Sequence, residues 1–152
     1  MVVAALVGGA VWYLQTYAFY TPVKFTPGAE IVLTPITSDQ PEPIVVKDVQ
    51  GIDSDSSPLR YRACFTTQMT LATLTEGYKV YDGATPLYAP NWFTCFDAEK
   101  IGAAILTGQA VAFLGQKNIV PNQDTIEIDR VIAVFPDGRA FAWNQLAPGT
   151  EQ

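Results

Sequence analysis

The 152-residue sequence contains no histidine. Histidine is the commonest general base near neutral pH, and its neutral ring is the commonest metal ligand. Its absence excludes Ser-His and Cys-His catalytic pairs. We predict no catalytic residue, no metal site and no cofactor for this chain.

Basic side chains are also scarce, with 9 Lys and Arg against 15 Asp and Glu, and a net charge of -6. A chain with this balance repels phosphate backbones, and no cluster of basic residues interrupts the pattern. Nucleic acid is therefore excluded as a partner, and no small-molecule substrate is identified. Hydrophobic residues make up 49% of the chain, which is sufficient for the core of one domain.

Charged side chains are missing from the beginning of the chain, and residues 1–20 are apolar or aromatic except for Gln15 and Thr16. Twenty helical residues rise about 30 Å, which matches the hydrocarbon thickness of a bilayer. We predict a transmembrane helix over residues 1–20, ended by Pro22. A cleaved secretory signal, with the small residues 8–10 as its processing site, and a buried helix are the alternatives.

Two groups of residues on this helix are candidates for contacts. Small residues four positions apart allow a second helix to approach closely, although such residues are common in membrane helices. They form a predicted docking stripe of Ala4, Ala5, Gly8 and Gly9. Aromatic rings prefer the headgroup boundary, and the predicted interface aromatics are Trp12, Tyr13, Tyr17, Phe19 and Tyr20.

After residue 20, five prolines make residues 21–43 a linker or edge segment, since proline cannot donate to a strand ladder. Residues 44–152 are predicted to form a mostly antiparallel sheet with one or two helices, so the fold class is α+β with an N-terminal transmembrane helix. Strands are expected at 30–34, 44–48, 60–66, 78–81, 110–114, 126–135 and 140–143, with 110–114 in the centre of the sheet and 51–58 as a loop. A short helix follows a Thr67 cap, and a longer one runs from an Asp97 cap to Gly108.

Cys64 and Cys95 are the only cysteines, and their spacing fits neither a CxxC motif nor a four-ligand metal site. A disulfide is the favoured interpretation, worth roughly 3 kcal/mol and stable only in an oxidising compartment. It places the domain in the periplasm. Two buried free thiols, or a reactive Cys95 acidified by the helix that begins at Asp97, are the alternatives.

Two polar motifs have a simple structural interpretation. The loop at 51–58 alternates Asp53, Asp55 and Ser57 as half of a calcium loop does, but it lacks the remaining oxygen ligands. Arg60 and Arg62 could receive an anion, yet the neighbouring acidic loop offers them partners. A solvated turn and local ion pairs are expected.

Several segments taken together carry a family resemblance: 13–20, 51–65, 92–97, 112–118, 128–131 and 142–143. The chain resembles a domain-of-unknown-function family of single-span proteins from photosynthetic and related alphaproteobacteria, some of which are mislabelled histidine kinase. The resemblance implies an uncharacterised membrane protein and brings no assigned activity or site. A kinase label does not suit this chain, because it has neither a phosphoacceptor histidine nor a nucleotide-binding loop.

The predicted location is the bacterial inner membrane, with a single span and the C-terminal domain in the periplasm. The first functional hypothesis is a non-catalytic accessory or assembly subunit of a larger inner-membrane complex, respiratory or photosynthetic, with the lipid bilayer and that complex as partners. A free-standing periplasmic binding or sensing module is the second. An enzyme that uses carboxylates or Cys95 is the third.

Overall fold

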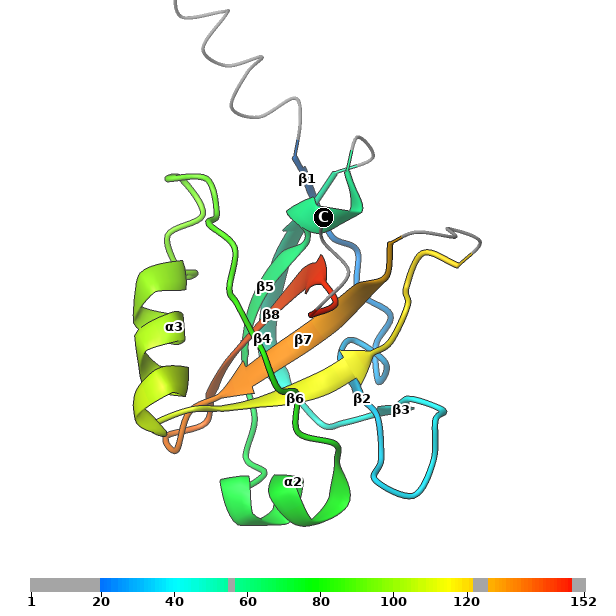
Figure 1. The fold of residues 1–152 in the computed structure, drawn as a ribbon. Helices are drawn as coiled ribbons and strands as arrows, with labels where there is room; N and C mark the ends of the chain where they lie inside the picture. Colours follow the sequence, from blue (N-terminus) through cyan, green and yellow to red (C-terminus); the bar gives the residue numbers. More distant parts are fainter. Residues whose placement is uncertain (1–19, 55–56, 122–125, 149–152) are drawn as a thin grey trace, which may run out of the picture.

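A six-stranded antiparallel sheet forms the centre of the computed structural model, which describes residues 20–54, 57–121 and 126–148 (Figure 1). In spatial order its strands are β1 (Thr21–Pro22), β4 (Lys47–Asp53), β5 (Arg62–Thr66), β8 (Arg139–Leu146), β7 (Ile128–Val134) and β6 (Val111–Gln116). A second, two-stranded sheet pairs β2 (Val32–Leu33) with β3 (Glu42–Pro43). The mostly antiparallel arrangement agrees with the sequence.

Both faces of the large sheet are covered by hydrophobic clusters. Successive residues of a strand point to opposite faces, so one strand contributes to both clusters. In β5, Ala63 and Phe65 belong to one hydrophobic cluster and Cys64 belongs to the other. The first cluster is covered by the small sheet and by α2 (Leu71–Gly77), and the second by α3 (Ala98–Thr107). The central strands are consequently enclosed by two layers.

The sequence signals at the ends of α3 are confirmed. The Asp97 carboxylate accepts a hydrogen bond from the backbone nitrogen of Lys100 at 3.1 Å, and Gly108 ends the helix with a φ of 79°. For α2 the predicted cap is wrong by one turn, because Thr70 rather than Thr67 accepts from the nitrogen of Thr73. A short 3-10 helix, η1 (Pro58–Arg60), replaces the beginning of the strand predicted at 60–66.

The expectation that residues 110–114 form the central strand is wrong, since β6 is the last strand in the sheet order. Its outer edge is covered by the segment 78–81 rather than by a full strand. The Leu114 nitrogen donates to the Lys79 carbonyl at 2.9 Å, and the Tyr81 nitrogen donates to the Ala112 carbonyl at 2.8 Å. This cover explains why an edge strand has a continuously apolar sequence.

The loop predicted at 51–58 is also shorter than expected, because β4 continues to Asp53. Gly51, in this part of β4, packs closely against Phe25. A Cβ at Gly51 would lie 2.8 Å from the Phe25 ring. A larger residue would displace that ring. Residues 21–43 contribute directly to the fold, since Ile31 and Leu33 are buried in the first hydrophobic cluster.

The membrane-spanning part of the predicted fold class is corrected. Across residues 20–54, 57–121 and 126–148, none of the helices has the length and apolar character needed to cross a bilayer. Residues 1–19 lie outside the described part of the chain. Tyr20, predicted as the last residue of the span, is non-helical and packs edge-on against Trp92, with 5.9 Å between ring centroids. The prediction of a span rested on the length and apolar character of the segment. At Tyr20, the apolar ring packs against Trp92 of the domain instead.

Candidate recognition groove

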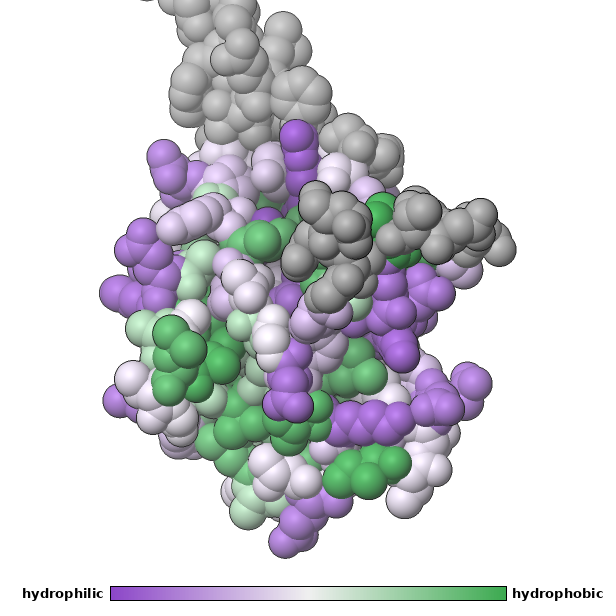
Figure 2. All heavy atoms as spheres, viewed as in Figure 1, coloured by the Kyte–Doolittle hydropathy of each residue, from purple (hydrophilic) through white to green (hydrophobic). Residues whose placement is uncertain are grey.

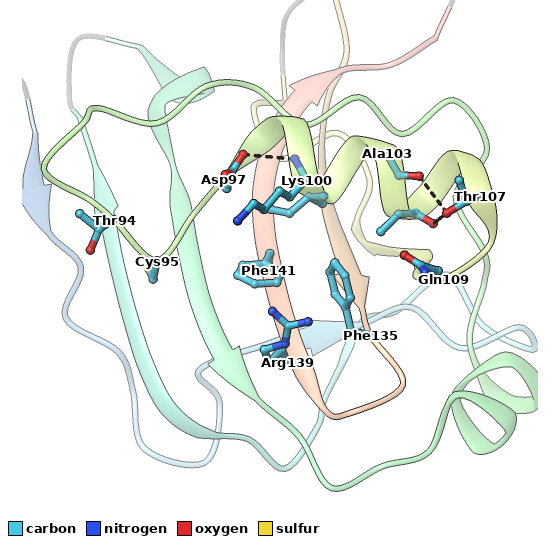
Figure 3. A pocket seen from close by; sticks show the side chains of 12 residues that line it. Thr94, Cys95, Asp97, Lys100, Ala103, Thr107, Gln109, Phe135, Arg139 and Phe141 are labelled. Carbon is cyan, nitrogen blue, oxygen red and sulfur yellow. Dashed lines mark hydrogen bonds between the residues drawn. The ribbon is translucent and has the colours of Figure 1, made fainter.

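An open groove of about 590 Å³ lies between α3 and the hairpin formed by β7 and β8 (Figure 3). Its wall on the helix side comes from one stripe of α3, because residues three and four apart lie on the same helix face. The lining residues are Thr94, Cys95, Asp97, Lys100, Ile101, Ala103, Ala104, Thr107, Gln109, Phe135, Arg139 and Phe141. Alanines at 103 and 104 leave the space open.

Two phenylalanine rings form the apolar surface of the groove. Phe135 and Phe141 meet edge to face, with centroids 5.6 Å apart and an interplanar angle of 80°. Phe141 also packs on Phe96 at 6.0 Å, which anchors the ring in the second hydrophobic cluster. The aromatic surface is therefore held by the core rather than by a mobile side chain.

Charged side chains of both signs surround the groove. Arg139 places its guanidinium 4.8 Å from the centroid of Phe135, and its Nε donates to Asp137 at 2.8 Å. The pKa of Asp137 is lowered, first by the backbone N–H of Arg139 and then by its guanidinium. Lys100 adds a second cation, whereas the single lining carboxylate, Asp97, already caps α3.

Several polar side chains of the groove are available for a ligand. Among the residues that the structure describes, the side chains of Thr94, Lys100 and Gln109 make no hydrogen bond or ion pair. The dashed line between Asp97 and Lys100 in Figure 3 ends on the Lys100 backbone nitrogen. The Thr107 hydroxyl donates to the Ala103 carbonyl at 3.0 Å and keeps its lone pairs as acceptors. Donors and acceptors therefore surround an aromatic surface.

The disulfide between Cys64 and Cys95 is present, with an S–S distance of 2.14 Å, as the sequence favours. It joins β5 to the segment that precedes α3, and Cys95 lines the groove. The alternative of a reactive thiol at Cys95 is wrong, because both sulfurs are bonded.

Arg62 is not the exposed anion receptor that the sequence allows. Only 4% of its surface is exposed, and its guanidinium donates to four main-chain carbonyls, those of Leu59, Tyr61, Leu87 and Tyr88. Burial lowers the pKa of Arg62 to about 10, which leaves it charged at neutral pH. Its function is to attach the segment 84–90 to the sheet.

The loop that resembles half of a calcium loop makes local hydrogen bonds, as expected for a turn. Asp53 accepts from the Ser54 nitrogen at 2.8 Å, and Ser57 accepts from the Leu59 nitrogen at 3.2 Å. Asp55 lies outside the described residues. Within the described ranges there is no group of three or more His, Cys, Asp or Glu side chains placed to hold a metal ion.

Sequence reasoning did not find the buried carboxylate of Asp129. Asp129 is 3% exposed, accepts from the Tyr81 hydroxyl at 2.8 Å and from the Asn118 nitrogen at 2.9 Å. The pKa of Tyr81 is raised by burial and then by Asp129, and that of Glu127 is raised chiefly by a hydrogen bond to Asp129. All residues of β7 except Arg130 are buried, so no alternation of burial marks Asp129 in the sequence.

The predicted contact residues on the N-terminal helix are tested only at one position. Tyr20 lies against Trp92 and under the guanidinium of Arg60, 5.6 Å from the ring centroid. The docking stripe and the other aromatics lie outside the described part of the chain, namely Ala4, Ala5, Gly8, Gly9, Trp12, Tyr13, Tyr17 and Phe19.

Exposed apolar side chains elsewhere are dispersed over several segments. On the face shown in Figure 2, hydrophobic atoms (green) are interrupted by hydrophilic ones (purple). The large exposed hydrophobic residues of the described ranges are Ile36, Val45, Val80, Tyr88, Leu106 and Ile126. The groove therefore remains the best-defined candidate site.

Fold and groove together define a small antiparallel domain with α3 on one sheet face, a disulfide, and an open aromatic groove with basic side chains. By sequence the chain belongs to a family of unknown function (DUF6446), whose model matches residues 31–152. Searches of curated proteins and of solved structures find no match to it.

Proposed function

We propose that this protein is a non-catalytic accessory or assembly subunit that docks onto a larger protein complex through the groove between α3 and the β7–β8 hairpin. The observation that carries the proposal is the groove itself. Aromatic residues and arginine are the residues that most often dominate the binding energy of protein interfaces. Phe135, Phe141 and Arg139 lie together there, beside polar side chains that have no partner within the described part of the chain.

The other polar residues of the interior support a structural role. Within the described residues, no buried side-chain nitrogen or oxygen lacks a hydrogen-bond partner. Arg62, Asp129 and Asn144 are each engaged with neighbouring groups. Catalytic groups are usually exposed to a substrate site and perturbed there, whereas these side chains hold segments of the fold together.

The disulfide supports a location in an oxidising compartment, and we propose the periplasm. Thiol labelling of intact cells tests it. With the disulfide formed in the cell, Cys64 and Cys95 stay unlabelled before and after lysis and react only after a reductant is added. Thiols that react on lysis without reductant would contradict this location.

Isolation of the full chain from the cells that produce it, in mild detergent, tests the docking function. The native chain is expected to migrate with a large complex in fixed stoichiometry. Ala103→Arg fills the groove from its exposed helical wall and is expected to abolish this migration. Ala72→Arg, at an exposed alanine on α2 that does not line the groove, is the matched control. A native chain that persists as a monomer would exclude the proposal.

A free-standing binding module is the second candidate, because a volume of about 590 Å³ is within the range of small-molecule pockets. The same experiment separates the two functions. A monomeric chain whose thermal stability increases with a small ligand, and loses that increase in Ala103→Arg, would favour the binding module.

A further inference from the structure

We infer that the groove binds an acidic peptide segment of the partner, with an aromatic or large aliphatic side chain as its anchor. This inference rests on the proposed docking function and names the chemistry of the occupant. Three features of the groove carry it: its local charge, its aromatic surface, and the distribution of its free polar groups.

Two of the three charged side chains that line the groove are positive, whereas the chain as a whole is acidic. The chain carries a net charge of -6, but Lys100 and Arg139 both line the groove. Asp97 is held as a helix cap, and the Nε of Arg139 bonds Asp137 while the two Nη nitrogens have no such partner among the described residues. Charge complementarity fixes orientation and accelerates association. An acidic segment is attracted here and repelled by most of the remaining surface.

The aromatic surface provides the anchor site. Phe135 and Phe141 already form one edge-to-face pair, and a further aromatic ring is favoured beside them in an offset-stacked or edge-to-face arrangement. Phe135 is partly exposed and offers most of this surface to a ligand, whereas Phe141 is largely buried, with 9% of its surface exposed. A purely acidic ligand would leave this apolar surface uncovered.

The shape of the polar lining favours a peptide over a compact small molecule. Thr94 precedes α3, Lys100 lies on its first turns, Gln109 follows its end, and Arg139 begins β8. The free polar side chains are therefore distributed from one end of the helix to the other (Figure 3). An extended chain can reach all of them and can pair its amide groups with the Thr94 hydroxyl and the Gln109 amide.

Fluorescently labelled synthetic peptides of equal length test this inference. The probe contains glutamates beside a phenylalanine. One control peptide replaces each glutamate by glutamine, and another replaces the phenylalanine by glycine. We expect the probe to bind the full chain at least about tenfold more tightly than either control peptide, with an affinity that falls as salt is added.

Variants locate the binding site. Lys100→Glu and Arg139→Gln are each expected to weaken binding of the probe by about tenfold or more. Lys24→Glu makes the same charge change as Lys100→Glu at an exposed position outside the groove and is expected to leave binding unchanged. Chemical-shift changes at Ala103 and Phe141 on addition of the probe provide a second measurement that does not depend on variants.

The outcomes separate this inference from the proposed function. No binding of the probe, equal binding of the glutamine peptide, or insensitivity to Lys100→Glu would each overturn the inference. Binding of an aliphatic carboxylate in the groove, in the absence of peptide binding, would overturn it as well. If migration with a large complex still depends on Ala103 in those cases, the docking function stands. If the chain binds the probe but never migrates with a complex, only the docking function is contradicted.

Discussion

At the scale of single residues, Arg62 shows how a buried charge is accommodated without a carboxylate partner among the described residues. Its Nε donates to the Leu87 carbonyl at 3.0 Å and its Nη2 to the Tyr88 carbonyl at 3.0 Å, across 25 and 26 residues of chain. The guanidinium also lies 5.9 Å from the ring centroid of Phe96. Arginine suits this position because its fixed fork offers several donors at once.

Arg62→Met is therefore expected to destabilise the fold by about 3 kcal/mol, since the main-chain carbonyls that it satisfies would lose their donor in a buried site. The free energy of unfolding from denaturant titration measures this loss. Arg139→Met is the matched control, because Arg139 has a 60% exposed side chain and pairs with exposed Asp137. A change below about 1 kcal/mol is expected there. Equal losses in both variants would contradict the assignment.

Glu127 and Asp129 form a second residue-scale feature, with a defined pH dependence. A hydrogen bond to Asp129 raises the pKa of Glu127 above its ordinary value of 4.5. The folded state thus holds this proton more tightly than the unfolded chain. The resulting stability is complete below about pH 4.5 and is lost as the pH rises through the raised pKa.

Glu127→Gln keeps a donor to Asp129 at every pH, so the variant is expected to be more stable than the native chain near pH 7. The gain should be less than about 1 kcal/mol, because the side chain is partly exposed to solvent. It should disappear below about pH 4.5. Thermal unfolding as a function of pH measures the difference, and Glu76→Gln on α2 controls for net charge. A gain that persists in acid would contradict the explanation.

At the scale of elements, the β7–β8 hairpin depends on its turn. Gly138 has a φ of 94°, and its nitrogen donates to the Phe135 carbonyl at 3.0 Å. A Cβ at this position would lie 2.6 Å from the Thr67 carbonyl oxygen, which belongs to another segment. The turn is therefore restricted both by its own backbone and by its neighbour.

Gly138→Ala is expected to destabilise the protein by about 2 kcal/mol, because both the left-handed backbone and the close approach of Thr67 oppose a side chain. Gly77→Ala is the matched control, since a Cβ at Gly77, the last residue of α2, has no neighbour within 4 Å. That change should be neutral or slightly stabilising. Denaturant midpoints compare the two, and a loss in Gly77→Ala equal to that in Gly138→Ala would contradict the argument.

Local signals in the sequence identify α3 and the hairpin because their determinants are adjacent along the chain. The Asp97 cap, Gly108 and the turn at 136–139 each act within a few residues. The position of β6 at the sheet edge depends on its cover by residues 78–81, a long-range contact with no local signature.

The groove likewise combines elements with local sequence signals and a long-range contact that has none. Its individual residues belong to elements that were predicted, but the approach of α3 to the turn at 136–139 is set by packing between Phe96 and Phe141. Cys95 was correctly assigned to a disulfide from composition and spacing. The burial of Asp129 was not predicted, because neither of its partners has a local sequence signal. Tyr81 is 48 residues away, and Asn118 donates through its backbone nitrogen.

At the scale of the whole molecule, the fold consists of a sheet covered on both faces. On one face the small sheet and α2 derive from residues 32–77, and on the other α3 derives from residues 98–107. The disulfide connects the second layer to β5 across 31 residues of sequence. Because the groove lies within this second layer, its shape depends on the attachment that the disulfide provides.

Replacement of both Cys64 and Cys95 by alanine is expected to reduce the free energy of unfolding by about 3 to 4 kcal/mol, because the unfolded chain gains the entropy of an open loop. Reduction of the native chain should have the same effect and should also weaken ligand binding in the groove, as the segment before α3 is released from β5. Thermal unfolding with and without reductant measures the stability, and alkylation establishes that both thiols have been reduced. A fully alkylated chain with an unchanged midpoint would show that packing by Phe96 and Ile101 holds this layer without the covalent link.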